Sequence, residues 1–215
     1  MNEVSKTLVQ CDFDGTITEE DVSFVMLDAF ADGDWKQLFT EYEEGKISVG
    51  YFNTTAFAMV KADRQSLLEI AMSKIKVRPG FHELVACCRR KGFRFVIVSN
   101  GLDFYIEKIL RDAGLADIEV YAAKTQFHPE GLKVHYIGPD GNQLDSDFKV
   151  AYVNSFLKEG YRIIYAGNGT SDIAPAKMCS HIFATGALLA YCQQTNLGCT
   201  PFTDFNEVVR VLELL

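Results

Sequence analysis

The chain has 215 residues, 48% of them hydrophobic, and a formal net charge of −8. This composition suffices for a full core in one domain with a sizeable insertion, and it excludes a disordered chain. The acidic balance weakens any case for nucleic-acid binding, which requires a basic face, but it is compatible with a small anionic ligand. The six cysteines include no C-x-x-C pair, so a structural zinc site is not expected.

The ends and the hydropathy of the chain bear on its location. No apolar stretch reaches membrane-spanning length, and the polar first six residues are unlike a signal peptide. We therefore expect a cytoplasmic protein with reduced cysteines, a monomer or homodimer, with a small-molecule partner and no nucleic-acid or membrane partner.

Hydrophobic periodicity predicts one short strand, then a helical insert, then alternating strands and helices. The first strand covers residues 7–11, and residues 19–76 show helical periodicity that suggests a small lid. The later alternation predicts βαβ units and a mostly parallel sheet. Its elements are a helix over 81–91, a strand over 93–98, a helix over 103–113, a strand over 118–122, a hairpin or loop over 125–144, a helix over 147–159, a strand over 161–166, a helix over 173–179, a strand over 181–184 and a helix over 205–215.

Three predicted strands end in polar segments that contain glycine. Asp12-Phe13-Asp14-Gly15 follows the first strand, and Ser99-Asn100-Gly101 and Gly167-Asn168-Gly169 follow two later ones. Ligands bind beyond the carboxyl ends of parallel strands, so these segments predict a site. Residues i and i+2 of an extended segment point the same way, which directs Asp12 and Asp14 into one space. Such a pair binds a divalent cation, exchanges protons or does both, although a solvated turn also explains it when taken alone.

The residue types at these strand ends suit phosphoryl transfer. Asp12 could attack phosphorus and form an aspartyl phosphate, while Asp14 could protonate the leaving oxygen and later take a proton from water. Ser99 and the backbone N–H groups after it suit phosphoryl oxygens, and Lys149 could offset developing charge. Taken singly, Ser99 is more often a cap and Lys149 more often a solvated helix residue.

The attacking Asp12 carboxylate and the phosphate ester are both negatively charged, so we expect Mg²⁺ to neutralise part of this charge. The sequence offers oxygen ligands for it from Asp12, Asp14, Asn168 and Asp172. Asp172 is also explained as an acidic residue that responds to the dipole at a helix N-terminus.

These motifs, taken together, closely resemble those of the haloacid dehalogenase superfamily of phosphohydrolases. The four motifs of that superfamily are matched by Asp12-Phe13-Asp14-Gly15-Thr16-Ile17-Thr18, Ser99-Asn100-Gly101, Lys149 and Gly167-Asn168-Gly169-Thr170-Ser171-Asp172. The resemblance spans nearly the whole chain and implies a three-layer Rossmann-like core with a parallel sheet and a helical C1-type cap after the first strand. It also implies a magnesium-dependent hydrolase of phosphoric monoesters.

The resemblance suggests a domain division and a branch of the superfamily. It places the core at residues 1–18 and 77–215 and the cap at residues 19–76. The insert looks like the cap of the phosphoserine-phosphatase-like branch. Within that branch the chain looks most like the methionine-salvage phosphatases, which act on 2-hydroxy-3-keto-5-methylthiopentenyl-1-phosphate.

The chain departs from the pattern of these phosphatases in its fourth motif. They usually carry a magnesium-binding Asp where this chain has Asn168. An amide oxygen ligates a hard cation but lacks the charge of a carboxylate. We expect weaker magnesium binding with activity retained, and Asp172 could compensate by moving closer.

The resemblance also implies which residues contact the substrate. Ser99, Asn100, Gly101 and Lys149 would bind the phosphoryl group. Asp21 falls where phosphoserine phosphatases carry a cap Glu, so it is a candidate substrate contact.

Substrate choice should depend on the cap. The cap segment 49–57 contains no Arg, and a carboxylate ligand favours such a fork-shaped partner, so phosphoserine is disfavoured. Tyr51, Phe52, Phe57 and Met59 could form an apolar wall for a less polar leaving group, or could simply be cap core. Two alternatives stay open: a phosphoserine phosphatase-like enzyme, and a weakly catalytic phosphate-binding regulatory protein.

Overall fold

The computed structural model describes residues 6–215, and its strands form one eight-stranded sheet. The strands are β1 (Lys6–Cys11), β2 (Arg94–Leu102), β3 (Glu119–Gln126), β4 (Lys133–Ile137), β5 (Gln143–Leu144), β6 (Tyr161–Gly167), β7 (His181–Ala184) and β8 (Thr200–Pro201). Their order is β5-β4-β3-β2-β1-β6-β7-β8. All pairs are parallel except β3–β4 and β4–β5. The first five residues, which include most of the segment used to judge a signal peptide, lie outside the described part.

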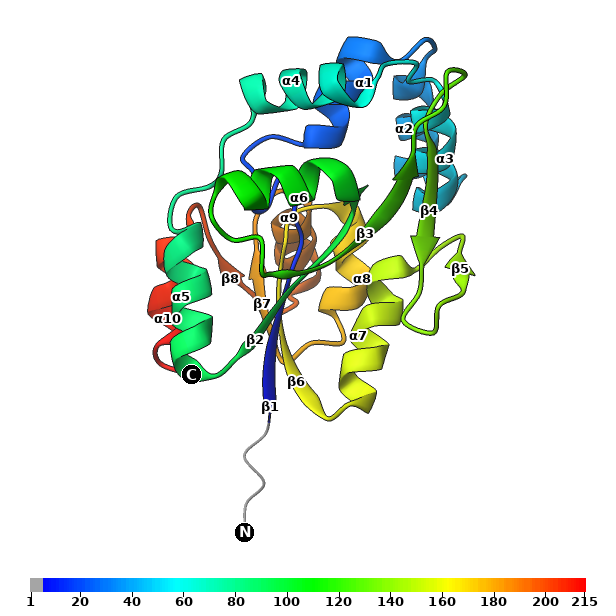
Figure 1. Cartoon of the computed structure of the whole chain (residues 1–215). Helices are drawn as coiled ribbons and strands as arrows, with labels where there is room; N and C mark the ends of the chain where they lie inside the picture. Colours follow the sequence, from blue (N-terminus) through cyan, green and yellow to red (C-terminus); the bar gives the residue numbers. More distant parts are fainter. Residues whose placement is uncertain (1–5) are drawn as a thin grey trace.

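Helices cover both faces of this sheet, which gives three layers (Figure 1). The core helices are α5 (Phe81–Lys91), α6 (Asp103–Asp112), α7 (Phe148–Lys158), α8 (Ile173–Ala176), α9 (Gly186–Thr195) and α10 (Phe205–Leu212). α5 packs against α10 on one side of the sheet, and α7 and α8 lie on the opposite side. Leu8, Val9 and Cys11 of β1 are fully buried, as expected for a strand covered on both faces.

Four helices between β1 and α5 form the cap, which lies above the carboxyl ends of the central strands (Figure 1). They are α1 (Val22–Phe30), α2 (Trp35–Glu43), α3 (Val49–Ala58) and α4 (Arg64–Lys74). Each begins at an Asp or Ser whose side chain accepts a backbone N–H of the first turn, as N-caps do. The chain leaves and returns to the core through an antiparallel bridge between Thr18 and Val77. The bridge lies beside the predicted division at residues 18/19 and 76/77, which stays a prediction.

The β4–β5 hairpin rests against the cap helix α3. The backbone N–H of Leu132 donates to the carbonyl of Phe57 over 3.2 Å, and the Ser48 hydroxyl donates to the carbonyl of Asp145 over 3.3 Å. A Cβ on Gly50 would collide with that same Asp145 carbonyl oxygen, so glycine permits the close approach. The hairpin therefore ties this side of the cap to the core.

Several elements differ from the sequence-based expectations. The second strand was expected over residues 93–98, but it continues to Leu102 with a register shift after Val98, so Ser99 lies within the strand. The helix expected over 173–179 is a 3₁₀ turn at Thr170–Asp172 followed by the single turn α8. Helix α9 and strand β8 were not predicted. Helix α9 begins at the N-cap residue Thr185, whose side chain makes no capping bond.

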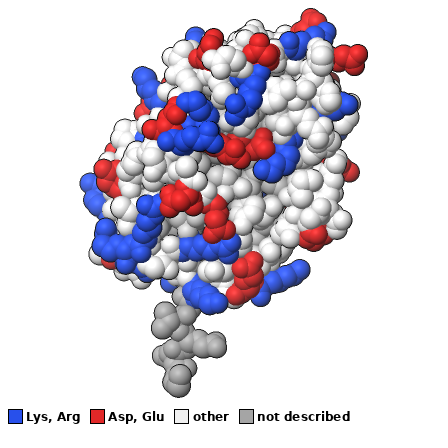
Figure 2. All heavy atoms as spheres, viewed as in Figure 1, with Lys and Arg blue, Asp and Glu red and all other residues white. Residues whose placement is uncertain are grey.

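The surface mixes charges of both signs. On the face shown in Figure 2, Lys and Arg side chains alternate with Asp and Glu, and no extended basic area is seen. Between residues 6 and 215, no helix combines the length and apolar character needed to cross a bilayer.

Candidate active site

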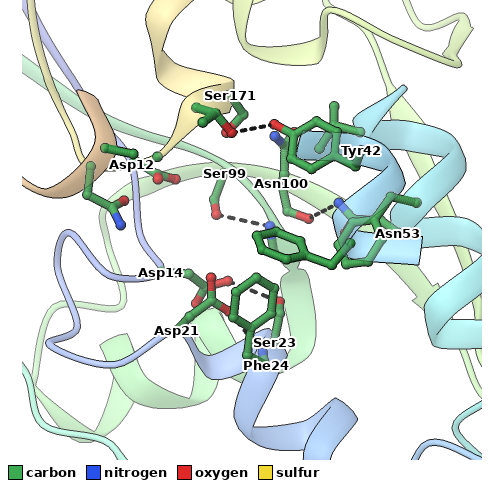
Figure 3. Close-up of a pocket in the computed structure, with 18 of the residues that line it drawn as sticks. Asp12, Asp14, Asp21, Ser23, Phe24, Tyr42, Asn53, Ser99, Asn100 and Ser171 are labelled. Carbon is green, nitrogen blue, oxygen red and sulfur yellow. Dashed lines mark hydrogen bonds between the residues drawn. The ribbon is translucent and has the colours of Figure 1, made fainter. Parts of the chain in front are cut away.

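The carboxyl ends of β1, β2 and β6 meet under the cap at a pocket of about 230 Å³ (Figure 3). Asp12 and Asp14 follow β1, Ser99 belongs to the end of β2, and Asn168 follows β6. The structure brings together all four predicted motifs, because Lys149 at the start of α7 also lines the pocket. The cap contributes the opposite wall through Asp21, Ser23, Phe24, Phe39, Tyr42, Glu43, Val49, Phe52 and Asn53.

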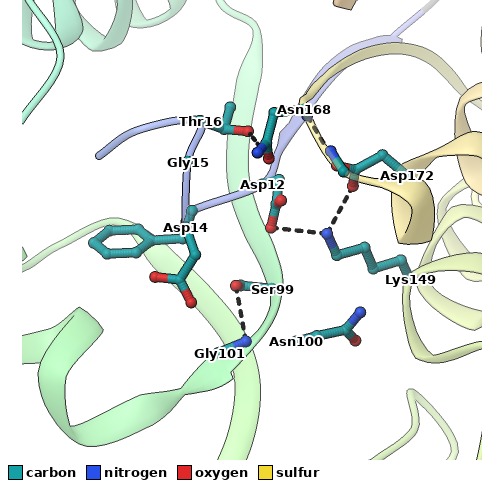
Figure 4. A network of polar contacts seen from close by, with 12 residues as sticks. Asp12, Asp14, Gly15, Thr16, Ser99, Asn100, Gly101, Lys149, Asn168 and Asp172 are labelled. Carbon is teal, nitrogen blue, oxygen red and sulfur yellow. Dashed lines mark hydrogen bonds and ion pairs between the residues drawn. The ribbon is translucent and has the colours of Figure 1, made fainter. Parts of the chain in front are cut away.

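Lys149 lies between two carboxylates at the base of the pocket (Figure 4). Its Nζ is 2.8 Å from Asp12 Oδ1 and 2.6 Å from Asp172 Oδ1. Burial opposes the charge of this lysine, but the two carboxylates raise the pKa of Lys149 above its ordinary value, so the ammonium form persists. Burial and the Asp172 charge raise the pKa of Asp12 to about 7, and Lys149 limits that rise.

Asp172 has a different role from the predicted one. Its Oδ1 accepts from Lys149 and, over 2.7 Å, from the Tyr165 hydroxyl, while its Oδ2 accepts from the backbone N–H groups of Asn168 and Gly169 at 2.9 and 2.8 Å. Burial opposes its charge, but Lys149 and these donors together lower the pKa of Asp172. With both oxygens engaged and the residue fully buried, Asp172 anchors Lys149 and the β6 loop. We therefore do not retain Asp172 as a metal ligand.

Asp14 faces hydroxyl groups. Its Oδ2 accepts from the Tyr105 hydroxyl of α6 and, over 3.2 Å, from the Ser23 hydroxyl of α1. Its Oδ1 is buried without a hydrogen-bond partner. Burial and the Asp21 carboxylate raise the pKa of Asp14 well above its ordinary value, and the two hydroxyl bonds only partly offset this. Ser23 and Tyr105 were not identified from the sequence, because neither lies in a motif.

The segment at the end of β2 presents side chains and backbone to the pocket. Ser99 is almost fully buried, and its Oγ accepts the Gly101 N–H over 3.0 Å. The Gly101 N–H, predicted to bind phosphate, is thus engaged within the segment. A Cβ on Gly101 would collide with the Tyr105 hydroxyl and with Asp14, so this position requires glycine. The Asn100 carbonyl accepts the Tyr136 hydroxyl over 2.6 Å, which fixes the strand end.

Asp21 lines the pocket from the cap and also begins helix α1. Its Oδ1 accepts the Phe24 N–H over 2.9 Å. Burial raises the pKa of Asp21 to about 6, while that N–H bond works against the rise. Asp21 therefore lies where the sequence placed a substrate contact, and one of its oxygens is occupied by the cap bond.

Asn168 is placed to offer an amide oxygen near β1. Its Oδ1 accepts the Thr16 hydroxyl over 2.8 Å, and its side chain lies against Gly15. In Figure 4 the Asp14 carboxylate lies on the far side of Asp12 from Asn168. In the described residues no three His, Cys, Asp or Glu side chains are grouped to hold a cation. A divalent cation would therefore rely on Asp12 with Asn168.

The charges of the pocket fit such a cation. Asp12, Asp14, Asp21 and Glu43 line the pocket, and Lys149 is the cationic side chain among the lining residues. Carboxylate and amide oxygens are hard donors of the kind Mg²⁺ prefers. A divalent ion would also offset the burial and the Asp172 charge that disfavour the ionised form of Asp12. The donor set fits magnesium, with fewer protein carboxylates than the sequence suggested.

The apolar wall of the pocket is aromatic, but it is not the predicted one. Phe24, Phe39, Tyr42 and Phe52 form a continuous cluster, with the Tyr42 and Phe52 rings stacked at 5.9 Å. Of the predicted wall only Phe52 lines this pocket. Tyr51 is 55% exposed outside the pocket, Phe57 is fully buried in the core cluster, and Met59 packs against Gly33. Helical periodicity identified apolar cap residues but could not show which of them face the cavity.

Comparison with known proteins identifies the family. The sequence profile of the haloacid dehalogenase-like hydrolases matches residues 9–177. The chain belongs to this family. The family predicted from the sequence motifs is thereby confirmed. The predicted fold class and the predicted enzyme class, a hydrolase of phosphoric monoesters, are confirmed with it.

Relatives are found by sequence and by structure. The 2-hydroxy-3-keto-5-methylthiopentenyl-1-phosphate phosphatase of Brevibacillus brevis is 29% identical over 98% of this chain and 97% of its own length. The Geobacillus thermodenitrificans protein of the same name is 29% identical over 95% of this chain and 94% of its own length. A phosphoserine phosphatase solved as a phospho-aspartyl intermediate analogue superposes with a TM-score of 0.72 at 19% identity, covering 96% of this chain and 99% of that one. This last likeness supports the fold alone.

Proposed function

We propose that this hydrolase is a magnesium-dependent phosphomonoesterase that forms an aspartyl phosphate on Asp12. The observation that carries the proposal is the ion pair between Asp12 and the buried Lys149 at the base of the pocket. Lys149 keeps Asp12 available as a carboxylate and also supplies positive charge where phosphoryl oxygens would lie. Attack by Asp12 on phosphorus would release the alcohol, and water would then hydrolyse the acyl phosphate.

Magnesium, held by Asp12 and Asn168, would supply the charge neutralisation that lets an anionic ester approach an anionic nucleophile. Lys149, whose position is fixed by Asp172, would bind the phosphoryl oxygens. Ser99, which lines the pocket through β2, would donate its hydroxyl to the same oxygens, because its lone pair already accepts the Gly101 N–H.

Asp14 is proposed as the general acid and base. Its raised pKa favours the protonated form, which is the form that donates a proton to a leaving oxygen. After the alcohol departs, the same group in its ionised form takes a proton from the attacking water. The two carboxylates of one motif thus carry out different steps.

The leaving group is proposed to be uncharged and partly apolar. Phe24, Phe39, Tyr42 and Phe52 face it, and among the lining residues no Arg or second Lys could pair with a carboxylate. This disfavours phosphoserine, which needs such a partner. A methionine-salvage keto-enol phosphate, the substrate in the names of the sequence relatives, has an apolar methylthio tail that suits this wall, and we propose it as the first candidate substrate.

Phosphate release from a panel of phosphorylated metabolites with Mg²⁺ tests this function. We expect turnover by the wild type and a loss of at least about a thousandfold in Asp12→Asn, because the nucleophile is removed. Asp28→Asn is the matched control, since Asp28 lies on the cap surface, where it pairs with Lys36, and it should retain full activity. Near-normal rates in Asp12→Asn would exclude the covalent route. Tight phosphate binding without turnover would instead support the regulatory alternative.

A further inference from the structure

Asn53 is a buried polar residue of the pocket wall that no step above uses. It lies on the cap helix α3, is only 6% exposed and lines the pocket together with Asn100 at the end of β2. Its Nδ2 donates to the Tyr136 hydroxyl over 2.7 Å and to the Asn100 carbonyl over 3.4 Å (Figure 3). The amide of this cap residue is therefore held against the strand segment that contains Ser99.

The hydrogen bonds around Tyr136 determine which end of the Asn53 amide faces the core. A tyrosine hydroxyl has one hydrogen, and Tyr136 donates it to the Asn100 carbonyl over 2.6 Å. Burial raises the pKa of Tyr136, so the hydroxyl keeps this hydrogen. Both oxygens can then only accept from Asn53, which requires its NH₂ group on this side. A turned amide would place Oδ1 against two oxygens with no hydrogen to share.

This arrangement leaves the other end of the amide, Oδ1, without a partner. In the described residues the hydrogen bonds of the Asn53 side chain are the two made by Nδ2. The side-chain atoms that are both buried and unpartnered between residues 6 and 215 are Gln10 Oε1, Asp14 Oδ1 and Thr125 Oγ1, so Asn53 Oδ1 must touch open space. That space is the pocket that Asn53 lines. A ligand that displaces water from it must donate to this oxygen or leave it unpaired.

We propose that Asn53 is a specificity-determining residue whose amide oxygen accepts a hydrogen bond from a hydroxyl group of the leaving group. This inference rests on the proposed function. The substrate class is then a phosphate monoester whose leaving group carries a hydroxyl near the ester oxygen and is otherwise apolar. The hydroxyl lies near that oxygen because Asn53 contacts Asn100, the residue after Ser99, while the aromatic wall receives the apolar part.

The fixed orientation of the Asn53 amide distinguishes substituents of similar size. A hydroxyl group can donate to Oδ1, whereas a ketone has only lone pairs and would face the amide oxygen with no hydrogen between them. A methylene group has no hydrogen to donate and leaves Oδ1 unpaired once water is displaced. The pocket should therefore favour a hydroxyl over a ketone or a methylene at this place.

Three esters of equal chain length test the proposal: 2-hydroxyhexyl phosphate, 2-oxohexyl phosphate and hexyl phosphate. We measure kcat/KM for phosphate release with Mg²⁺ in the wild type and in Asn53→Leu, which keeps the size of the side chain but removes its acceptor. The ratio of wild type to variant for each ester cancels the different basicities of the three leaving alcohols. We expect a loss of roughly five- to fiftyfold for the hydroxy ester and less than about threefold for the other two.

Thr54→Val is the matched control. Thr54 follows Asn53 on α3, but it is exposed, and its hydroxyl donates to the Gly50 carbonyl of the same helix. This variant replaces a polar side chain by an apolar one outside the pocket lining, so kcat/KM for all three esters should stay within about twofold of the wild type.

Tyr136→Phe tests the orientation of the amide separately. It removes the hydroxyl that holds the Asn53 NH₂ group but keeps the acceptor oxygen, and Tyr136 is not among the lining residues. We expect a selective loss for the hydroxy ester that is smaller than the loss in Asn53→Leu.

The outcomes separate this inference from the proposed function. Equal losses for all three esters in Asn53→Leu would overturn the specificity role, because a structural defect lowers all three together, and so would unchanged values. If Asn53→Leu does not fold, as judged by circular dichroism, Tyr136→Phe decides, and equal or absent losses there would overturn the proposal. If the wild type releases phosphate from none of the three esters or from 4-nitrophenyl phosphate, the proposed function fails and this inference fails with it.

Discussion

Replacing Asp172 by Asn keeps the shape of the side chain but removes its charge and two of its acceptor sites. One oxygen now receives Lys149 and Tyr165, and the other receives two backbone N–H groups. The amide NH₂ must face one of these donor pairs, so two buried donors lose their acceptor and Lys149 keeps one carboxylate. Breaking a buried ion pair costs about 3–5 kcal/mol. For a chain of this size, about 3 kcal/mol lowers Tm by roughly 6–12 °C.

Urea unfolding in EDTA measures this effect without any contribution from metal. We expect Asp172→Asn to lose about 3 kcal/mol of unfolding free energy, while the Mg²⁺ concentration for half-maximal turnover changes by less than about threefold. Asp147→Asn is the control, because Asp147 is exposed and its φ of 57° is one that Asn tolerates. Unchanged stability in EDTA with a tenfold higher magnesium requirement would restore Asp172 as a metal ligand and refute the anchoring role.

Three other changes have defined outcomes. Gly50→Ala should lower Tm, measured by circular dichroism, because its Cβ meets the Asp145 carbonyl; an unchanged Tm would mean that the hairpin yields. Asn168→Asp should lower the Mg²⁺ concentration for half-maximal turnover, since a carboxylate adds charge; tighter metal use by the wild type contradicts this. Hydrogen bonds from Arg94 lower the pKa of Glu119, so Glu119→Gln should cost less than about 1 kcal/mol at pH 7 in urea unfolding. That difference should disappear as pH falls through the lowered pKa, and a constant difference would exclude the charge as its source.

Much of the fold follows from local patterns in the sequence. The apolar runs that became β1, β2 and β6 are continuous because both faces of the sheet are covered, and polar glycine-containing segments mark where each run ends. In a parallel sheet these ends share one edge, so the meeting of Asp12, Ser99 and Asn168 could be predicted without coordinates. The helical insert was equally visible, because the apolar residues of segment 19–76 recur with helical periodicity.

The parts that could not be predicted depend on where side chains point across distant elements. Whether Phe39 or Phe57 faces the pocket depends on how α2 and α3 pack, and periodicity does not show that. Tyr105 lies in an ordinary apolar helix face, and its hydroxyl contacts Asp14 only because β1 places that carboxylate beside it. Asp172 fits a metal shell by spacing, and only the four donors around it show that its oxygens are taken.

The proposed division of labour between the two motif aspartates is supported by the partners that each one meets. Both are buried, and burial alone would protonate both. Asp12 faces an ammonium group, which favours its charged form and holds its pKa near neutrality. Burial and the Asp21 carboxylate raise the pKa of Asp14 well above its ordinary value, and its two neutral hydroxyl partners only partly offset that rise. A nucleophile must be ionised and a general acid must hold a proton, so the same residue type suits opposite tasks at positions two apart.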